Sequence, residues 1–287
     1  MKFRFVHEHR ETFRVGMMCR VLRVSRSGYY AWCGRQPSAR EHSDQRLAER
    51  IREVHEASRE AYGAPRIHAV LRHEGIRVGR KRIARLMQWE GISGCAKQRF
   101  KRTATVRAEL PAPPNLVEGD FRSDAPDRVW VGDITHIRTR EGWLYLAVLL
   151  DLFSRKIVGY ATASHTRQQL ALQAFDRAVK SRRPKAGLVH HTDRGSVYLS
   201  TEYQGRLDRW KMHCSVSKPG RCADNAVAES FFHTLKTEWL YHFDFHTREE
   251  ARLAIFDYIE TFYNRRRLHS AIGYRSPDEY ERLEAAA

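Results

Sequence analysis

Cysteine is scarce in this sequence, and apolar segments long enough to cross a membrane are missing. The five cysteines are odd in number and form no C-x-x-C pair, which argues against a disulfide framework. One zinc set can be imagined, but its spacing fits no standard pattern: His7, His9, Cys19 and Cys33. There is no apolar run of 18 residues and no N-terminal signal sequence. These absences predict a cytoplasmic protein that does not bind a membrane.

Acidic residues are in the minority. The chain has 51 lysines and arginines against 34 aspartates and glutamates, which gives a formal net charge of +17. Such an excess favours a polyanionic partner, and nucleic acid is the first candidate. With 287 residues, of which 42% are hydrophobic, the chain can bury a sizeable core and is expected to hold more than one domain.

The first part of the chain is predicted to be helical and basic. Residues 1–60 form a basic helical arm, and residues 61–94 form two short helices in a helix-turn-helix arrangement. Pro65 suits the first turn of the first helix and Gly75 its end. Basic residues crowd the outer face of the second helix: Arg80, Lys81, Arg82 and Arg85. We expect them to contact DNA phosphates rather than bases; the alternative is a structural hairpin whose arginines face solvent.

Residues 95–127 are predicted to be a proline-rich and basic linker, because helix cannot continue through Pro111, Pro113 and Pro114. From Arg128 onward the pattern changes to strands. Three strands follow at short spacing, which indicates an antiparallel meander, and strands and helices then alternate up to residue 245. This order predicts an α/β fold, a sheet with helices packed on it.

Three carboxylates occupy positions where a solvated charge is not expected. Asp133 lies in the middle of an interior strand, and Asp193 follows the C-terminal end of another. Glu229 lies beside the apolar stripe of an amphipathic helix, and Lys236 follows two turns later on the same face. Carboxylates that meet repel one another and require a counter-charge, and Mg²⁺ is the usual hard cation bound through oxygen. Two such ions support phosphodiester chemistry.

Neighbouring polar residues have plainer interpretations. We expect Asp151 to pair locally, and Glu238 is a rival to Glu229 that lies on the opposite side of the helix. His190 and His191 are interpreted as structural neighbours of Asp193. The helix is expected to be capped by two residues, Asp224 and Asn225.

Three motifs resemble the catalytic core of retroviral-integrase-type transposases. They are W-x-x-D-I-T (Trp130–Thr135), H-x-D-R-G-S-x-Y (His191–Tyr198) and D-N-A-x-x-E-S-F-F-x-x-L-K-x-E (Asp224–Glu238). The chain is most similar to the second-reading-frame proteins of bacterial insertion sequences of the insertion-sequence-three family. The segment Tyr263–Tyr280 resembles the C-terminal signature of that family.

The resemblance implies an RNase H-like fold with a mixed five-stranded sheet in a catalytic core at 128–245, completed by a C-terminal helix and basic tail at 246–287. It implies a magnesium-dependent polynucleotidyl transferase that nicks insertion-sequence ends and transfers strands, with Asp133, Asp193 and Glu229 as catalytic and metal-binding residues. Two Mg²⁺ ions, or Mn²⁺ in their place, are expected with DNA bound. Five further residues are expected at the DNA: Lys236, Asn225, Arg265, Arg266 and Arg267.

The expected partners are double-stranded DNA at the nucleoid and further copies of this chain. Members of the family usually act as a fusion whose first-frame portion supplies a leucine zipper, and this N-terminus has no sustained heptad run. The alternative is therefore an accessory or regulatory DNA-binding subunit that is inactive without the first-frame portion. A plain RNase H-type nuclease is disfavoured, because hydrolysis of a hybrid needs neither a basic helix pair nor a basic tail.

Overall fold

The computed structural model describes residues 1–36, 38–95, 113–218 and 222–285. Pro111 of the predicted linker lies outside the described residues. The chain divides into two compact units, Met1–Glu53 and Val54–Ala287. The domain limits expected from the sequence remain predictions.

The first unit holds three short helices, α1 (Lys2–Glu8), α2 (Val15–Val21) and α3 (Arg26–Cys33). They close around a small core of four buried side chains: Val6, Met18, Cys19 and Tyr29. The side chain of Ser25 accepts a hydrogen bond from the backbone N–H of Gly28 and caps the start of α3. A longer helix, α4 (Ala39–Ala57), continues into the second unit.

The predicted helix pair is present in the second unit as α5 (Ala64–His73) and α6 (Arg80–Trp89). Pro65 lies in the first turn of α5, and Gly75 adopts a φ of +79° just after its end, as expected of a residue that terminates a helix. The two helices pack through buried apolar residues: Ile67, Leu71, Ile83 and Leu86.

The sheet of the core has five strands in the order β3-β2-β1-β4-β5. The strands are β1 (Val129–Thr139), β2 (Gly142–Asp151), β3 (Ile157–Ala163), β4 (Val189–Thr192) and β5 (His213–Val216). β1 to β3 form an antiparallel meander, and β4 and β5 add parallel to β1. The mixed five-stranded sheet is therefore confirmed, with β1 as an interior strand.

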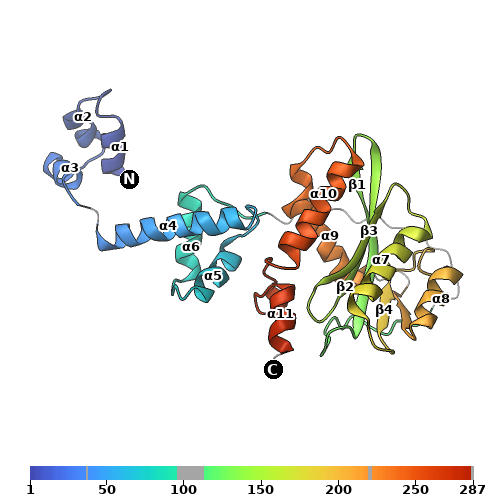
Figure 1. The fold of residues 1–287 in the computed structure, drawn as a ribbon. Coiled ribbons are helices and arrows are strands. Elements are labelled where there is room, and N and C mark those ends of the chain that lie inside the picture. The colour runs from blue at the N-terminus through green and yellow to red at the C-terminus, as the bar shows by residue number, and fades with distance from the viewer. Residues whose placement is uncertain (37, 96–112, 219–221, 286–287) are drawn as a thin grey trace. The chain divides into compact units, whose positions relative to one another are not determined.

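Helices cover both faces of this sheet (Figure 1). On one face, α7 (Gln168–Arg182) and α8 (Thr201–Arg209) enclose a core built around Trp130, Phe175 and Tyr203. α9 (Ala226–Glu238) and α10 (Arg248–Phe256) lie on the other face and contact β1. This arrangement places the start of α9 beside the middle of β1.

The C-terminal segment belongs to the same core. After α10 the chain forms the wide turn η3 (Asp257–Tyr263), the short turn η4 (Ser270–Ile272) and α11 (Pro277–Glu284). A capping box between Ser276 and Glu279 starts α11. Arg182 of α7 donates two hydrogen bonds to Glu281 of α11, at 2.8 and 2.9 Å, which ties the last helix to the sheet layer.

Candidate active site

Asp133 lies on β1, one residue beyond the last pair that joins β1 to β4. Its neighbour Gly132 pairs with Thr192 of β4. A Cβ atom at Gly132 would meet the His190 ring at 3.0 Å and the Thr192 methyl group at 3.2 Å. Asp133 is half-buried, and its Oδ1 accepts a hydrogen bond from the backbone N–H of Ile134 at 2.7 Å. The lack of a side chain at Gly132 therefore leaves room for the His190 ring and the Thr192 methyl group next to this carboxylate.

Asp193 is the first residue after β4, as the sequence pattern predicts. Its Oδ1 accepts a hydrogen bond from the backbone N–H of Gly195 at 2.9 Å, which closes a tight turn. A Cβ atom at Gly195 would lie 2.9 Å from that same oxygen, so a larger residue there would displace the Asp193 carboxylate. Arg194 between them donates to the carbonyl of Ser217 at 3.0 Å and anchors the loop to the end of β5.

Glu229 lies in the first turn of α9 and is exposed. α9 packs against β1 through its apolar side, where Ala228, Phe231 and Leu235 are buried. Lys236, two turns after Glu229, is half-buried. The helix therefore presents a carboxylate near its N-terminus and an ammonium group near its C-terminus on the side that faces Asp133.

The charges of these residues act on one another. Burial is the main cause that raises the pKa of Asp133, and the carboxylates of Asp193 and Glu229 add to the rise. The hydrogen bond from the Ile134 N–H and the charge of Lys236 oppose it, and the resulting pKa is about 8. Burial also lowers the pKa of Lys236, and the Asp133 carboxylate works against that shift. The three predicted acidic residues and the lysine are thus within electrostatic range of one another, although they come from three separate parts of the chain.

The donor set fits a hard divalent cation. Burial is the main cause of the raised pKa of Asp133, and repulsion from Asp193 and Glu229 adds to it, so a bound cation would favour the charged carboxylate. Within the described ranges, no three His, Cys, Asp or Glu side chains lie close enough to form a metal cage. The same finding applies to the zinc set imagined at the N-terminus, where the Cys33 Sγ lies 3.7 Å from the His7 Nδ1.

The basic residues predicted to meet DNA fall into two groups. Arg80, Lys81 and Arg85 are exposed on α6 and Arg82 is half-buried there. Arg265 and Arg266 are exposed after η3.

Two residues of this set require correction. Arg267 is only 4% exposed, and two of its guanidinium nitrogens donate to Glu238 at 2.7 Å. Asn225 is also 4% exposed, and its Nδ2 donates to the carbonyl of Gly132 at 3.3 Å. Both predictions of DNA contact are therefore wrong in this structure: burial withdraws Arg267 into an ion pair and turns Asn225 toward the backbone beside Asp133.

Glu238 is not a rival to Glu229. It is buried at the end of α9 and accepts hydrogen bonds from Arg267 and, at 2.9 Å, from the Tyr258 hydroxyl. Arg66 of α5 adds a third donor at 3.4 Å. A carboxylate enclosed by these donors has a structural role.

The plainer interpretations of the other polar residues are confirmed for three of them. Asp151 accepts hydrogen bonds from Ser154 and from the backbone N–H of Asp127, so it pairs locally. His190 and His191 are buried and bond to Tyr203 and Ser215, each at 2.8 Å. Burial lowers the pKa of His190 to about 3, which keeps the ring neutral.

The expected capping of α9 is wrong. Asn225 occupies the N-cap position without a side-chain cap bond. Asp224 instead accepts hydrogen bonds from the backbone N–H of Lys218 and from the Asn115 side chain, each at 2.9 Å. Asn115 lies in the predicted linker, and no sequence signal marked it; its partner is 109 positions away.

Residues 123–222 and 229–284 each match a family model described as an integrase core domain, and residues 42–102 match one described as an HTH-like domain. The transposase InsF for insertion sequence IS3A of Escherichia coli (strain K12) is 40% identical over 288 residues, with 100% of both chains covered.

Two further matches are more distant or less characterised. The insertion element IS600 uncharacterized 31 kDa protein of Shigella sonnei is 43% identical over 272 residues, which cover 93% of this chain and 100% of that protein. A solved structure of the HTLV-2 integrase catalytic core domain in complex with magnesium is 18% identical, with a TM-score of 0.42, 55% of this chain covered and 98% of that one.

Proposed function

Because this chain belongs to the insertion-sequence-three family of transposases, we propose that it cuts the ends of an insertion sequence and joins them to other DNA with Asp133, Asp193 and Glu229 as its catalytic residues. The family and the integrase core domain make it a DNA-acting polynucleotidyl transferase of transposition. The observation that supports the residue assignment is that Asp193 and Glu229 lie close enough to Asp133 for both carboxylates to add to the rise in its pKa that burial causes.

In this proposal the three carboxylates hold divalent cations, and Mg²⁺ is the expected ion with Mn²⁺ as a substitute. When bound, two such ions activate the attacking oxygen and stabilise the leaving oxygen of an in-line displacement. In cleavage, the oxygen of water forms a new P–O bond and the bond between that phosphorus and the 3′-oxygen of the element breaks. The 3′-oxygen takes up a proton and becomes the free 3′-hydroxyl, and the phosphate stays on the 5′ end of the flanking strand. In strand transfer that hydroxyl loses its proton, a new P–O bond forms to the target phosphorus, and the target's own bridging P–O bond breaks.

The protein's own groups position these reactants. Asp133 is held by the pairing of β1 with β2 and by the hydrogen bond from the Ile134 N–H, and Asp193 by the hydrogen bond from the Gly195 N–H. Lys236 is near enough to Asp133 to affect its pKa, which supports a role in binding a phosphate next to the reacting bond. The exposed basic residues of α6, together with Arg265 and Arg266 after η3, are proposed to contact DNA phosphates away from the reacting bond.

The test replaces Glu229 by Gln, which preserves size and removes the charge. Cleavage and strand transfer on labelled insertion-sequence ends should be lost, and DNA affinity should stay nearly unchanged. The matched control is Asp208→Asn, since Asp208 is an exposed carboxylate on α8. The assignment fails if Glu229→Gln retains the activity of the Asp208→Asn control.

The partners are proposed to be insertion-sequence ends, target DNA, further copies of this chain and the first-frame protein or fusion. No helix among the described residues is long and apolar enough to cross a membrane. We propose that the chain acts at the bacterial nucleoid, where its DNA substrate lies. The accessory alternative is not favoured, because the chain matches a transposase over its full length and carries all three carboxylates. An assay with and without the first-frame portion measures how far this chain acts alone.

A further inference from the structure

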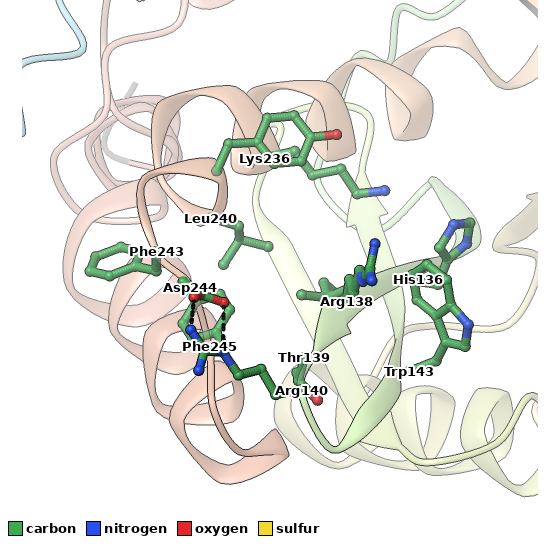
Figure 2. A pocket seen from close by; sticks show the side chains of 12 residues that line it. His136, Arg138, Thr139, Arg140, Trp143, Lys236, Leu240, Phe243, Asp244 and Phe245 are labelled. Carbon is green, nitrogen blue, oxygen red and sulfur yellow. Dashed lines mark hydrogen bonds and ion pairs between the residues drawn. The ribbon is translucent and has the colours of Figure 1, made fainter.

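A groove runs along the end of the β1–β2 hairpin and reaches Lys236 of α9 (Figure 2). It has a volume of about 840 Å³, within the range of about 300–1,000 Å³ found for ligand sites. Its walls come from the second half of β1, the start of β2, and the segment that follows α9. We call this space the hairpin groove. It is large enough for part of a nucleic-acid strand, and Lys236 belongs both to it and to the candidate active site.

The charge of the hairpin groove is positive. Arg138 is exposed, and its guanidinium makes no hydrogen bond or ion pair with another residue of the described part of the chain, although its charge helps to lower the pKa of Asp244. Figure 2 shows the nitrogen ends of Arg138 and Lys236 facing the same space. The one acidic residue in the lining, Asp244, is engaged by the guanidinium of Arg140, which lowers the pKa of Asp244. Arg138 and Lys236 therefore remain available for phosphate.

Aromatic rings line the same groove. Trp143 is 47% exposed, Tyr241 is 56% exposed and Phe243 is 45% exposed. The edge of the His136 ring meets Trp143 with the centroids 4.9 Å apart and the planes at 88°, which holds the indole in place. Burial and the nearby Lys236 lower the pKa of His136, so this ring is neutral at pH 7.

Exposed aromatic faces beside cations are the chemistry that binds unpaired nucleotides. Bases stack on aromatic rings while Lys and Arg follow the backbone. A base inside a duplex is already stacked on both sides, so a ring can receive only a base that has left the duplex. Along β1, Arg138 lies five residues beyond Asp133, or roughly 17 Å at about 3.3 Å per residue, and this odd spacing places the two side chains on opposite faces of the strand. Lys236 lines the groove and also acts on Asp133, so a DNA strand whose phosphodiester reacts at Asp133 would pass Lys236 to enter the groove.

We propose that the hairpin groove binds the unpaired nucleotides of a DNA strand next to the reacting phosphodiester. Trp143 stacks on a base, and Arg138 binds a phosphate. The proposal rests on the proposed function for the place of the chemistry, but binding itself requires no catalysis. Trp143 and Arg138 would select DNA ends that are frayed or single-stranded over ends that are fully paired.

The test measures the affinity of the full chain, without divalent metal, for two fluorescent duplexes. One is blunt, and the other carries a short 3′ overhang of thymidines. Trp143→Ala should weaken binding of the overhang duplex by about five- to a hundredfold and leave the blunt duplex unchanged, because one stacked base is lost. The matched control is Trp210→Ala, since Trp210 is a tryptophan exposed to a similar degree at the end of α8.

Two further variants keep the test decisive. Trp143→Phe should restore most of the preference for the overhang, because a ring is still present. Arg138→Gln should reduce the slope of log affinity against log salt concentration for the overhang duplex by about one. Arg209→Gln on α8 is the charge-matched control.

The proposal is overturned if Trp143→Ala weakens the binding of both duplexes equally, or if it weakens overhang binding no more than Trp210→Ala does. It is also overturned if the unchanged chain binds the overhang duplex no more tightly than the blunt one. Loss of strand transfer in Glu229→Gln with a normal overhang preference supports both the proposed function and the groove. An inactive wild-type chain that keeps a Trp143-dependent preference would count against the proposed function alone.

Discussion

Glu229 and Glu238 lie on the same helix and have opposite surroundings. Glu229 is exposed at the first turn of α9. Glu238 is 5% exposed at its last turn, where Arg267, Tyr258 and Arg66 donate to it. A charge exposed to water is free to bind an ion, whereas a charge enclosed by donors is part of the core. Two glutamates on one helix therefore differ in role: Glu229 is proposed to bind a cation, and Glu238 is part of the core.

We predict that Glu238→Gln destabilises the protein by about 3–5 kcal/mol, because it leaves the buried guanidinium of Arg267 without its counter-charge. Urea unfolding measures the change. The matched control is Glu249→Gln, since Glu249 forms an exposed ion pair with Arg252 that is worth at most about 1 kcal/mol. Equal stability of the two variants would contradict the structural role of Glu238.

We predict that the protein loses stability in acid because the His190 ring is buried. Its folded pKa is lowered to about 3 by burial, whereas an unfolded histidine has a pKa of about 6.5. Below pH 6.5 the unfolded chain gains a proton that the folded chain does not bind, so the free energy of unfolding falls as the pH falls. One such group removes about 2 kcal/mol between pH 6.5 and pH 5.

The measurement is the slope of unfolding free energy against pH over that interval. His190→Gln should flatten the slope by up to about one proton, whatever its effect on absolute stability. His213→Gln changes an exposed histidine on the adjacent strand β5 and serves as the control. An unchanged slope in His190→Gln would mean that this ring is not kept neutral by burial.

At the scale of elements, the α5–α6 pair carries the exposed basic residues that precede the core. Lys81 is exposed on the first turn of α6, with its side chain away from the buried face of Ile83 and Leu86. We predict that Lys81→Gln weakens binding of unrelated duplexes to a similar extent and lowers the salt slope by about one, as loss of a phosphate contact does.

The control is Lys185→Gln, which removes the same charge from an exposed position before β4. Anisotropy titrations at several salt concentrations distinguish the two. If Lys81→Gln instead changed affinity for only one DNA sequence, Lys81 would read a base and the phosphate role would be wrong.

Much of the core could be predicted from residue patterns. Apolar residues on both faces of β1 indicated an interior strand, and the structure places β1 between β2 and β4. Asp133 within that strand and Asp193 after β4 were recognisable because a carboxylate there is costly without a partner.

Interactions between distant segments could not be predicted in this way. Glu238 and Arg267 lie 29 positions apart and meet only because η3 turns the chain back toward α9. Arg138 and Trp143 are opposite each other in the β1–β2 register, which depends on where the hairpin turns. Periodicity within one element contains no information on which segments meet.

At the scale of the whole molecule, the helical segment from Val54 onward is bonded to the C-terminal part of the core. The Tyr62 hydroxyl accepts a hydrogen bond from the backbone N–H of Leu268 at 2.7 Å, and Arg66 donates to the carbonyl of Leu268 at 3.1 Å. Arg59 pairs with Asp257 at 2.8 Å and lies over the Trp239 ring. The second unit therefore joins segments that are far apart in sequence.

A pair of shortened chains tests this organisation. Removal of residues 1–36 should leave the melting temperature of the remainder unchanged, because the apolar core of α1 to α3 is self-contained. Removal of residues 1–95 should lower the melting temperature, because buried groups around Leu268 and Glu238 lose their hydrogen-bond partners. Each lost partner is expected to cost about 1–3 kcal/mol. Calorimetry on both chains gives the answer, and an equal melting temperature for the two would refute the second expectation.

The bond between Tyr62 and Leu268 also has a consequence during synthesis of the chain. The two residues are 206 positions apart. At about 5–20 residues per second, a ribosome needs roughly 10–40 s to make Leu268 after Tyr62 has been made. During that interval Tyr62 and Arg66 lack the backbone partners that they have in the finished protein. A nascent chain can therefore expose its basic helices well before it completes the fold that holds its three carboxylates. A chain whose synthesis stops before Leu268 never completes that fold.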